Sequence, residues 1–240
     1  MKHYKAGFSS FLLSPAGRFS VNPIPAPAGI EQLSMTENKQ NEIKVAVFDL
    51  NGTFYNDSSK DEFFKFVSKK KPRKVAYYFQ MLYYKLLLKL NQIRQTEFKE
   101  NFFNYLDNLS PEQVEAYARE FWQQEYPDNF NQEVKERLDK LKQEGVQVYC
   151  ATGGLELYVN PLFELYPIDG IFGTKANYVD NTYLVDGKAC KAEEKLKRLD
   201  EHFGGKRYKI VEAFSDSKEE ILDEAQKAWL IKDGKLKRYR

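Results

Sequence analysis

The sequence predicts an α/β fold, a Rossmann-like parallel sheet with an α-helical segment inserted after the first strand. Two observations lead to this prediction. The apolar run Val45–Phe48 ends on Asp49 and a turn that contains Gly52, which is typical of a buried parallel strand. From Val146 onward, short apolar runs alternate with helical patterns, as they do in open α/β sheets.

The residues between the first strand and this alternation are expected to be helical. A capping-box pattern at 59–62 opens an amphipathic run that Pro72 interrupts, and Ser110 with Pro111 is typical of another helix start. The helix that approaches Gly145 should end there, because glycine suits the position just after a helix. The helices expected in this part lie at about 59–70, 75–90, 96–109, from 111 onward and 131–144.

The later strands are short and separated by turn residues. Asp180 and Asn181 predict a tight hairpin turn, and the charged helix at about 191–203 should stop at Gly204 and Gly205. The strands expected here lie at 146–151, 171–172, 178–179, 183–185, 208–214 and 228–231. We predict a disordered leader at 1–40, a core at 41–57 and 131–240, and a helical cap at 58–130.

Composition excludes some classes of function. The 240 residues carry a formal net charge of +2, so no strong basic field favours nucleic acid as a partner. Two histidines and two widely separated cysteines oppose a zinc site. The aromatic content of 15% argues against disorder of the whole chain.

Polar residues follow three of the predicted strands. Asp49, Thr152 and Asp216 each stand at the carboxyl end of a strand, where open α/β sheets bind ligands. A carboxylate at such an edge can act as a nucleophile or a metal ligand. Each residue alone also has an ordinary explanation, such as a loop or a helix N-cap. Their order along the chain, with Lys195 between Thr152 and Asp216, resembles the order of motifs in the haloacid dehalogenase superfamily and is stronger evidence than any one residue.

The block from Asp49 to Thr53 resembles the first motif of the haloacid dehalogenase superfamily, Asp-x-Asp-x-Thr, with Asn51 in place of the second aspartate. The resemblance extends over 44–240 and is nearest to the phosphoserine phosphatase-like subfamily IB. Within that branch the chain is most similar to phosphatidylglycerophosphatase C and its relatives. The segments that carry this similarity are 61–66, 190–196, 214–217 and 229–236.

The resemblance implies an Mg²⁺-dependent phosphomonoester hydrolase that forms a phospho-aspartate. Asp49 would be the nucleophile, and Lys195 would neutralise it together with the phosphate. The catalytic residues implied are Asp49, Asn51, Thr152 and Lys195. The phosphate-binding residues implied are Thr53, Gly153 and Gly154. The metal ligands implied are Asp49, Asn51 through its backbone carbonyl, Asp216 and Glu220.

Asn51 stands where the family has its general acid–base. An amide can neither protonate the leaving oxygen nor activate water, and this catalysis contributes about 10²–10⁴-fold. The chain is then a slower phosphatase with a substitute acid, or one whose leaving group needs little protonation. The alternatives are a protein that binds phosphorylated ligands without turnover and a substitution introduced to trap the phosphoenzyme.

The substrate class rests on the cap. Ser58 stands where phosphoserine phosphatases carry a glutamate, and no arginine lies between Arg94 and Arg119, so free phosphoserine is disfavoured. The segment 75–90 holds two lysines and is shorter than the ~20 residues of a transmembrane helix. This segment predicts peripheral membrane contact, and we therefore expect the substrate to be a lipid phosphate such as phosphatidylglycerol phosphate. The alternatives are a buried cap helix and a soluble phosphometabolite as substrate. We expect a cytoplasmic protein, with or without membrane association.

Overall fold

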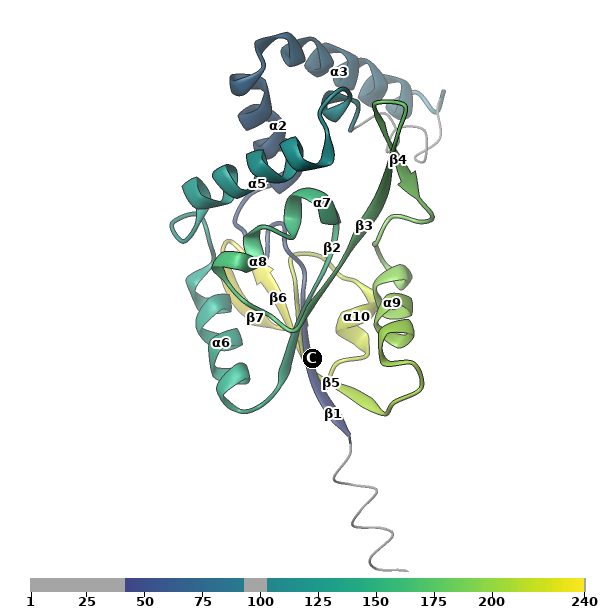
Figure 1. Cartoon of the computed structure of the whole chain (residues 1–240). Coiled ribbons are helices and arrows are strands. Elements are labelled where there is room, and N and C mark those ends of the chain that lie inside the picture. The colour runs from purple at the N-terminus through teal and green to yellow at the C-terminus, as the bar shows by residue number, and fades with distance from the viewer. Residues whose placement is uncertain (1–41, 93–102, 240) are drawn as a thin grey trace, which may run out of the picture. The chain divides into compact units, whose positions relative to one another are not determined.

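The computed structural model describes residues 42–92 and 103–239 (Figure 1). The predicted leader and residues 96–102 of a predicted helix lie outside the described residues. The strands are β1 (Ile43–Phe48), β2 (Gln147–Leu155), β3 (Gly170–Val179), β4 (Thr182–Asp186), β5 (Tyr208–Ser215), β6 (Lys227–Lys232) and β7 (Lys235–Arg238). They form one sheet in the order β4-β3-β2-β1-β5-β6-β7.

The predicted α/β fold is confirmed. The pairs β3–β2, β2–β1, β1–β5 and β5–β6 are parallel, and only β4 and β7 pair antiparallel at the two edges. The turn at Asp180 and Asn181 has positive φ at both residues, which suits a tight hairpin. The two short strands predicted at 171–172 and 178–179 are one strand, β3, and the sequence analysis missed β7.

Residues of β1 alternate between two apolar layers. Ala46 and Phe48 pack with α6 (Gln132–Gln143) on one face, and Val45 and Val47 pack with α9 (Glu193–Phe203) on the other. Successive side chains of a strand point to opposite faces, so a strand buried on both faces is apolar throughout. Figure 1 shows α6 on one side of the sheet and α9 with α10 (Glu220–Asp223) on the other.

The segment that follows β1 is largely helical, as predicted. Its helices are α2 (Ser59–Lys70), the 3₁₀ turn η1 (Pro72–Val75), α3 (Ala76–Lys89), the 3₁₀ turn η2 (Asn104–Leu106) and α5 (Pro111–Glu125). Tyr55 forms an isolated bridge with Phe130 where this segment leaves and rejoins the sheet. Two short helices that were not predicted, α7 (Glu156–Val159) and α8 (Leu162–Leu165), follow β2. The division into core and cap at 58 and 130 stays a prediction.

The helix termini differ in how they are capped. Ser110 and Gln113 form the reciprocal capping box of α5. The capping box predicted at the start of α2 does not form. The Ser59 hydroxyl instead lies 3.2 Å from the Tyr158 hydroxyl, and the Ser59 N–H donates to Asn51 Oδ1 over 2.7 Å. A distant residue therefore caps α2.

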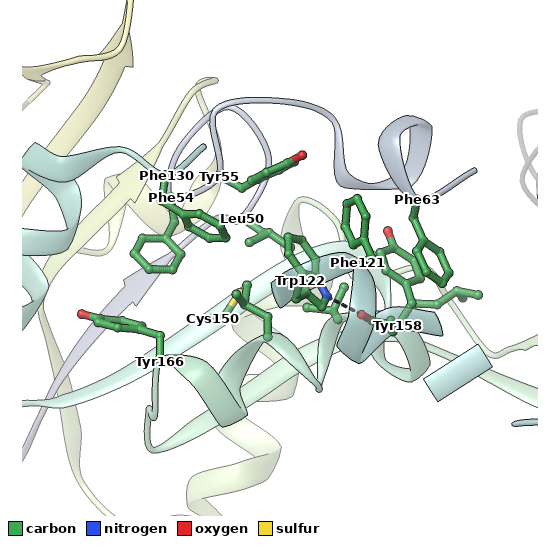
Figure 2. Close-up of a cluster of buried hydrophobic side chains, with 14 of the residues drawn as sticks. Leu50, Phe54, Tyr55, Phe63, Phe121, Trp122, Phe130, Cys150, Tyr158 and Tyr166 are labelled. Carbon is green, nitrogen blue, oxygen red and sulfur yellow. Dashed lines mark hydrogen bonds between the residues drawn. The ribbon is translucent and has the colours of Figure 1, made fainter. Parts of the chain in front are cut away.

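A cluster of aromatic side chains joins the helical segment to the sheet (Figure 2). Phe63 of α2 stacks on Tyr158 of α7 with a ring-centroid distance of 5.0 Å. The indole N–H of Trp122 in α5 donates to the backbone carbonyl of Tyr158 over 2.6 Å. Because both contacts converge on Tyr158, α2 and α5 pack on α7, the short helix that follows β2.

The buried carboxylate of Glu212 in β5 connects the sheet to α6. It accepts hydrogen bonds from the Arg137 guanidinium of α6 and from the Trp229 indole N–H of β6, the latter over 2.8 Å. Burial by itself would raise the pKa of Glu212, but these two donors hold it below its usual value. The pair joins α6 to the neighbouring strands β5 and β6.

Replacing Arg137 with methionine should therefore destabilise the protein. The substitution leaves the Glu212 carboxylate buried without its guanidinium, and breaking a pair of this kind costs about 3 kcal/mol. Urea unfolding at pH 7 measures the loss. Arg119→Met is the matched control, because Arg119 pairs with Glu164 at the surface and its loss should cost much less. Equal losses in the two variants would contradict this account of Glu212.

Candidate active site

Asp49 and Asp216 lie at the point where the strand order of the sheet reverses. Asp49 follows β1, and its N–H still donates to the Phe214 carbonyl of β5 over 2.9 Å. Asp216 follows β5, the neighbouring strand on that side. Ligands of open α/β sheets bind at such a switch point.

A cavity of about 260 Å³ opens there. The residues that line it come from the loop after β1, α2, the residue before η2, β2, α7, the loop before α9, α9 itself and the loop after β5. They are Asp49, Asn51, Ser58, Lys60, Phe103, Gly153, Gly154, Tyr158, Lys191, Lys195, Asp216, Ser217 and Glu219.

Lys195 is the buried cation of this cavity. Its side chain is only 2% exposed, and its ammonium nitrogen lies 3.4 Å from Asp49 Oδ1 and 2.5 Å from Glu219 Oε2. Burial by itself would lower the pKa of Lys195, but the charges of Asp49 and Glu219 outweigh burial and raise it. Lys195 therefore stays protonated and offsets the negative charge around Asp49.

The surroundings of the Asp49 carboxyl group disfavour its charged form, because the group is buried. Burial raises its pKa from 3.8 to about 6, against the opposing charge of Lys195, and Glu219 and Asp216 contribute to the rise. The Leu50 N–H donates to Asp49 Oδ1 over 2.7 Å and orients the carboxylate. A poorly solvated carboxylate at a strand end has the character of a nucleophile.

The residues around Asp216 fit a hard divalent cation such as Mg²⁺. A Cβ built on Gly52, which has a φ of +67°, would lie 2.6 Å from Asp216 Oδ2, so only glycine lets this carboxylate approach the loop after β1. Within 42–92 and 103–239, no group of three or more His, Cys, Asp or Glu side chains is arranged to hold a metal. Two carboxylates suffice for Mg²⁺, which keeps several waters and uses substrate phosphates as ligands.

Asn51 lines the cavity, but its side-chain oxygen is engaged elsewhere. Oδ1 accepts the backbone N–H of Ser59, the first residue of α2. It thus satisfies one of the free N–H groups at the start of that helix. Asn51 therefore connects the loop after β1 directly to the segment that covers the cavity.

The predicted phosphate-binding residues Thr53, Gly153 and Gly154 and the predicted catalytic residue Thr152 differ in whether they reach the cavity. Gly153 and Gly154 line the cavity. Thr152 and Thr53 are fully buried and are not among the lining residues. The Thr152 hydroxyl accepts the Gly154 N–H over 3.2 Å, and the Thr53 hydroxyl has no hydrogen-bond partner among the described residues.

The structure brings Glu219, rather than Glu220, to the predicted set. Glu220 is exposed in the first turn of α10. Glu219, in extended conformation at the N-cap of that helix, points to Lys195. Lys60, Lys191 and Glu219 are lining residues that sequence analysis missed. Two adjacent glutamates look alike in sequence, and only the start of α10 distinguishes them.

Comparison with known proteins agrees with this geometry. The family model described as haloacid dehalogenase-like hydrolase matches residues 46–219. The chain belongs to this family. No curated protein matches the chain.

Solved structures share the fold at low sequence identity. A protein with unknown function from Bordetella pertussis Tohama I has a TM-score of 0.66 at 15% identity, over 78% of this chain and 89% of that one. A phosphoserine phosphohydrolase-like protein from Francisella tularensis has a TM-score of 0.52 at 19% identity, over 78% and 86%. A probable phosphoserine phosphatase from Vibrio cholerae has a TM-score of 0.55 at 15% identity, over 78% and 55%.

The raised pKa of Asp49 predicts that this residue destabilises the metal-free protein. The folded protein holds the proton up to about pH 6 whereas the unfolded chain releases it near 3.8, so the free energy of unfolding falls as pH rises between these values. A rise of this size corresponds to about 3 kcal/mol. Asp49→Asn should thus be more stable than the natural chain at pH 7, and the difference should vanish below pH 4.

Urea unfolding in EDTA between pH 4 and 8 measures this difference. Asp57→Asn, an exposed position in the same loop, is the control and should show no comparable gain. Equal stability of the Asp49→Asn variant and the natural chain at pH 7 would contradict the assigned environment.

Proposed function

We propose that the protein hydrolyses phosphomonoesters with Mg²⁺ through a phospho-aspartate on Asp49. The observation that carries this proposal is the convergence of Asp49, Lys195 and Asp216 on one cavity at the switch point of the sheet. Family membership supports it, since the matched model is that of a hydrolase.

In this mechanism, Asp49 attacks the phosphorus and the bond to the leaving oxygen breaks. Lys195 holds the Asp49 carboxylate in its charged form and offsets charge that builds up on the phosphoryl oxygens. Mg²⁺, held by Asp49 and Asp216, would supply a positive charge that polarises the phosphoryl group. Water then attacks the phospho-aspartate, releases phosphate and restores Asp49.

The weak step is proton transfer, because Asn51 cannot give a proton to the leaving oxygen. Its engagement with Ser59 favours a second candidate function, a protein that binds phosphorylated ligands with little turnover. In that case Asn51 serves mainly to connect the loop after β1 with α2. The two functions differ in the rate of phosphate release.

Asn51→Asp should raise the rate of phosphate release. An aspartate at this position can still accept the Ser59 N–H, and its charge suits the start of a helix, so the fold should be kept. General acid–base catalysis then becomes available, with an expected gain of about 10²–10⁴-fold. The measurement is phosphate release from phosphatidylglycerol phosphate with Mg²⁺, in the natural chain and in the variant.

Asn56→Asp is the matched control, because it makes the same change at an exposed position of the same loop and should leave the rate unaltered. Turnover by the natural chain would establish a phosphatase with a substitute acid. Turnover only after the substitution favours the phosphate-binding function. If neither the natural chain nor the Asn51→Asp variant, both folded, releases phosphate from lipid or soluble phosphomonoesters, the proposed hydrolase function would be overturned.

The finer proposal is a lipid phosphate as substrate, and α3 supports it. The apolar side chains Val75, Tyr78, Phe79, Leu82, Tyr83, Leu86 and Leu90 are between 44% and 68% exposed. Positions 79, 83, 86 and 90 follow the three- and four-residue spacing of one helix face. Met81, on a different face, is buried. The alternative of a wholly buried cap helix therefore fails for the outer face of α3.

A basic cluster lies at the start of this apolar face. Lys69, Lys71 and Arg73 are exposed, and Lys85 is exposed on α3 itself. Basic residues beside an apolar helix face favour the surface of an anionic membrane, with about 1 kcal/mol per basic residue. In the described part of the chain, no helix is long and apolar enough to cross a membrane.

Phe79→Glu combined with Tyr83→Glu should abolish binding to anionic vesicles. Both side chains are exposed, so the double variant should fold, and the new charges oppose insertion and repel anionic lipid. Co-sedimentation with vesicles rich in phosphatidylglycerol measures binding, and vesicles of phosphatidylcholine alone should retain much less protein.

Lys140→Glu is the control, since it makes the same change in net charge at an exposed position of α6 and should bind as the natural chain does. Absence of binding by the natural chain, or undiminished binding by the double variant, would overturn the membrane contact. A soluble phosphometabolite would then be the better substrate class.

A further inference from the structure

Acidic side chains and Lys191 lie on different sides of the cavity, next to strands on opposite sides of β1. Asp216 and Glu219 follow β5, on one side of β1. Gly153 belongs to β2, on the other side of β1, and Lys191 lies against it. Lys60 of α2 also lines the cavity. The cavity therefore has an acidic side, suited to a cation, and two lysines beyond Lys195.

Lys191 is held in place by the backbone around it. A Cβ built on Gly153 would lie 2.5 Å from Lys191 Cε and 3.1 Å from its Cγ, so the lysine stem occupies the space that a side chain at 153 would fill. The next residue, Ala192, has a φ of +51°, which a residue other than glycine rarely adopts. Such strain persists where the surrounding structure holds the chain in place and is common at ligand sites.

The positive charge of Lys191 acts on Lys60. Burial lowers the pKa of Lys60, and the positive charges of Lys191 and Lys85 lower it further, against Asp61. Lys191 makes no ion pair with any described residue. Like charges gathered at one cavity repel one another, and an anionic ligand relieves that repulsion. The charge of Lys195 is offset within the protein by Asp49 and Glu219.

We propose that the cavity binds phosphomonoesters whose leaving group carries a second negative charge, and that Lys60 and Lys191 bind this second anion. The inference rests on the proposed function, because Asp49 must face the phosphoryl group. The second anion is a phosphodiester if the substrate is a lipid such as phosphatidylglycerol phosphate, and a carboxylate if it is a soluble metabolite. Lysine ammonium groups bind either of them through charge-assisted hydrogen bonds.

Two pairs of substrates with matched skeletons test the proposal. Phosphatidylglycerol phosphate carries a phosphodiester that phosphatidic acid lacks, and 3-phosphoglycerate carries a carboxylate that glycerol 3-phosphate lacks. The quantity measured is the ratio of kcat/KM for the doubly charged substrate to that for its partner. In the natural chain the ratio should exceed ten for one pair, and that pair identifies the source of the anion.

Lys60→Gln and Lys191→Gln should each lower this ratio about 10–100-fold, the effect of losing one charge-assisted contact. Lys140→Gln, at an exposed position of α6, is the control and should keep the ratio. Gly153→Ala should act in the same direction as Lys191→Gln, because the added methyl displaces the Lys191 stem. A ratio near one in the natural chain, or equal losses on both members of a pair, would overturn the proposal.

A second measurement distinguishes failure of the proposed hydrolase function from failure of the anion site. If no phosphomonoester is hydrolysed, the dissociation constants of 3-phosphoglycerate and glycerol 3-phosphate are measured by calorimetry with Mg²⁺. A preference for 3-phosphoglycerate that Lys191→Gln removes would support the anion site without the hydrolase. Equal affinities, or absence of binding, would overturn the site as well.

Discussion

The buried ammonium of Lys195 is the interaction on which the site depends. Three carboxylates, those of Asp49, Asp216 and Glu219, line one cavity at the ends of two adjacent strands. Without a cation, their repulsion and desolvation would keep Asp49 protonated, as its raised pKa already indicates. Lys195 lowers the free-energy cost of charging Asp49. It can do so because α9 packs on the sheet and carries the lysine under the carboxyl ends of the strands.

Asn51 illustrates how one side chain serves both structure and chemistry. Its oxygen caps α2, which ties that helix to the loop that carries Asp49. Tyr158 of α7 receives contacts from both α2 and α5, so these helices are also tied to the segment that follows β2. A carboxylate could make the same cap. Under the proposed function, the amide keeps this connection but cannot transfer a proton, so the geometry of the site would be kept while one chemical step is slowed.

The outer face of α3 has no such role in the packing. Met81 is the one buried side chain of α3, while five of the helix's large apolar residues are exposed, together with Val75 and Leu90 at its two ends. Exposed apolar patches of this kind mark binding surfaces.

The sequence by itself determined the parallel sheet and most of its elements. The apolar strands of the core, the capping box of α5, the hairpin turn at 180–181 and the glycine after α6 are local patterns, and local conformational preferences decide them. Asp49 and Asp216 were also found from sequence, since strand ends meet at one edge of a parallel sheet, and Lys195 was found from the resemblance to the family. Only the tertiary structure decided that Glu219 rather than Glu220 reaches Lys195, that Asn51 caps α2 and that Lys191 lies along Gly153. These contacts join residues from different elements, so their geometry depends on how helices pack on the sheet, which no local pattern encodes.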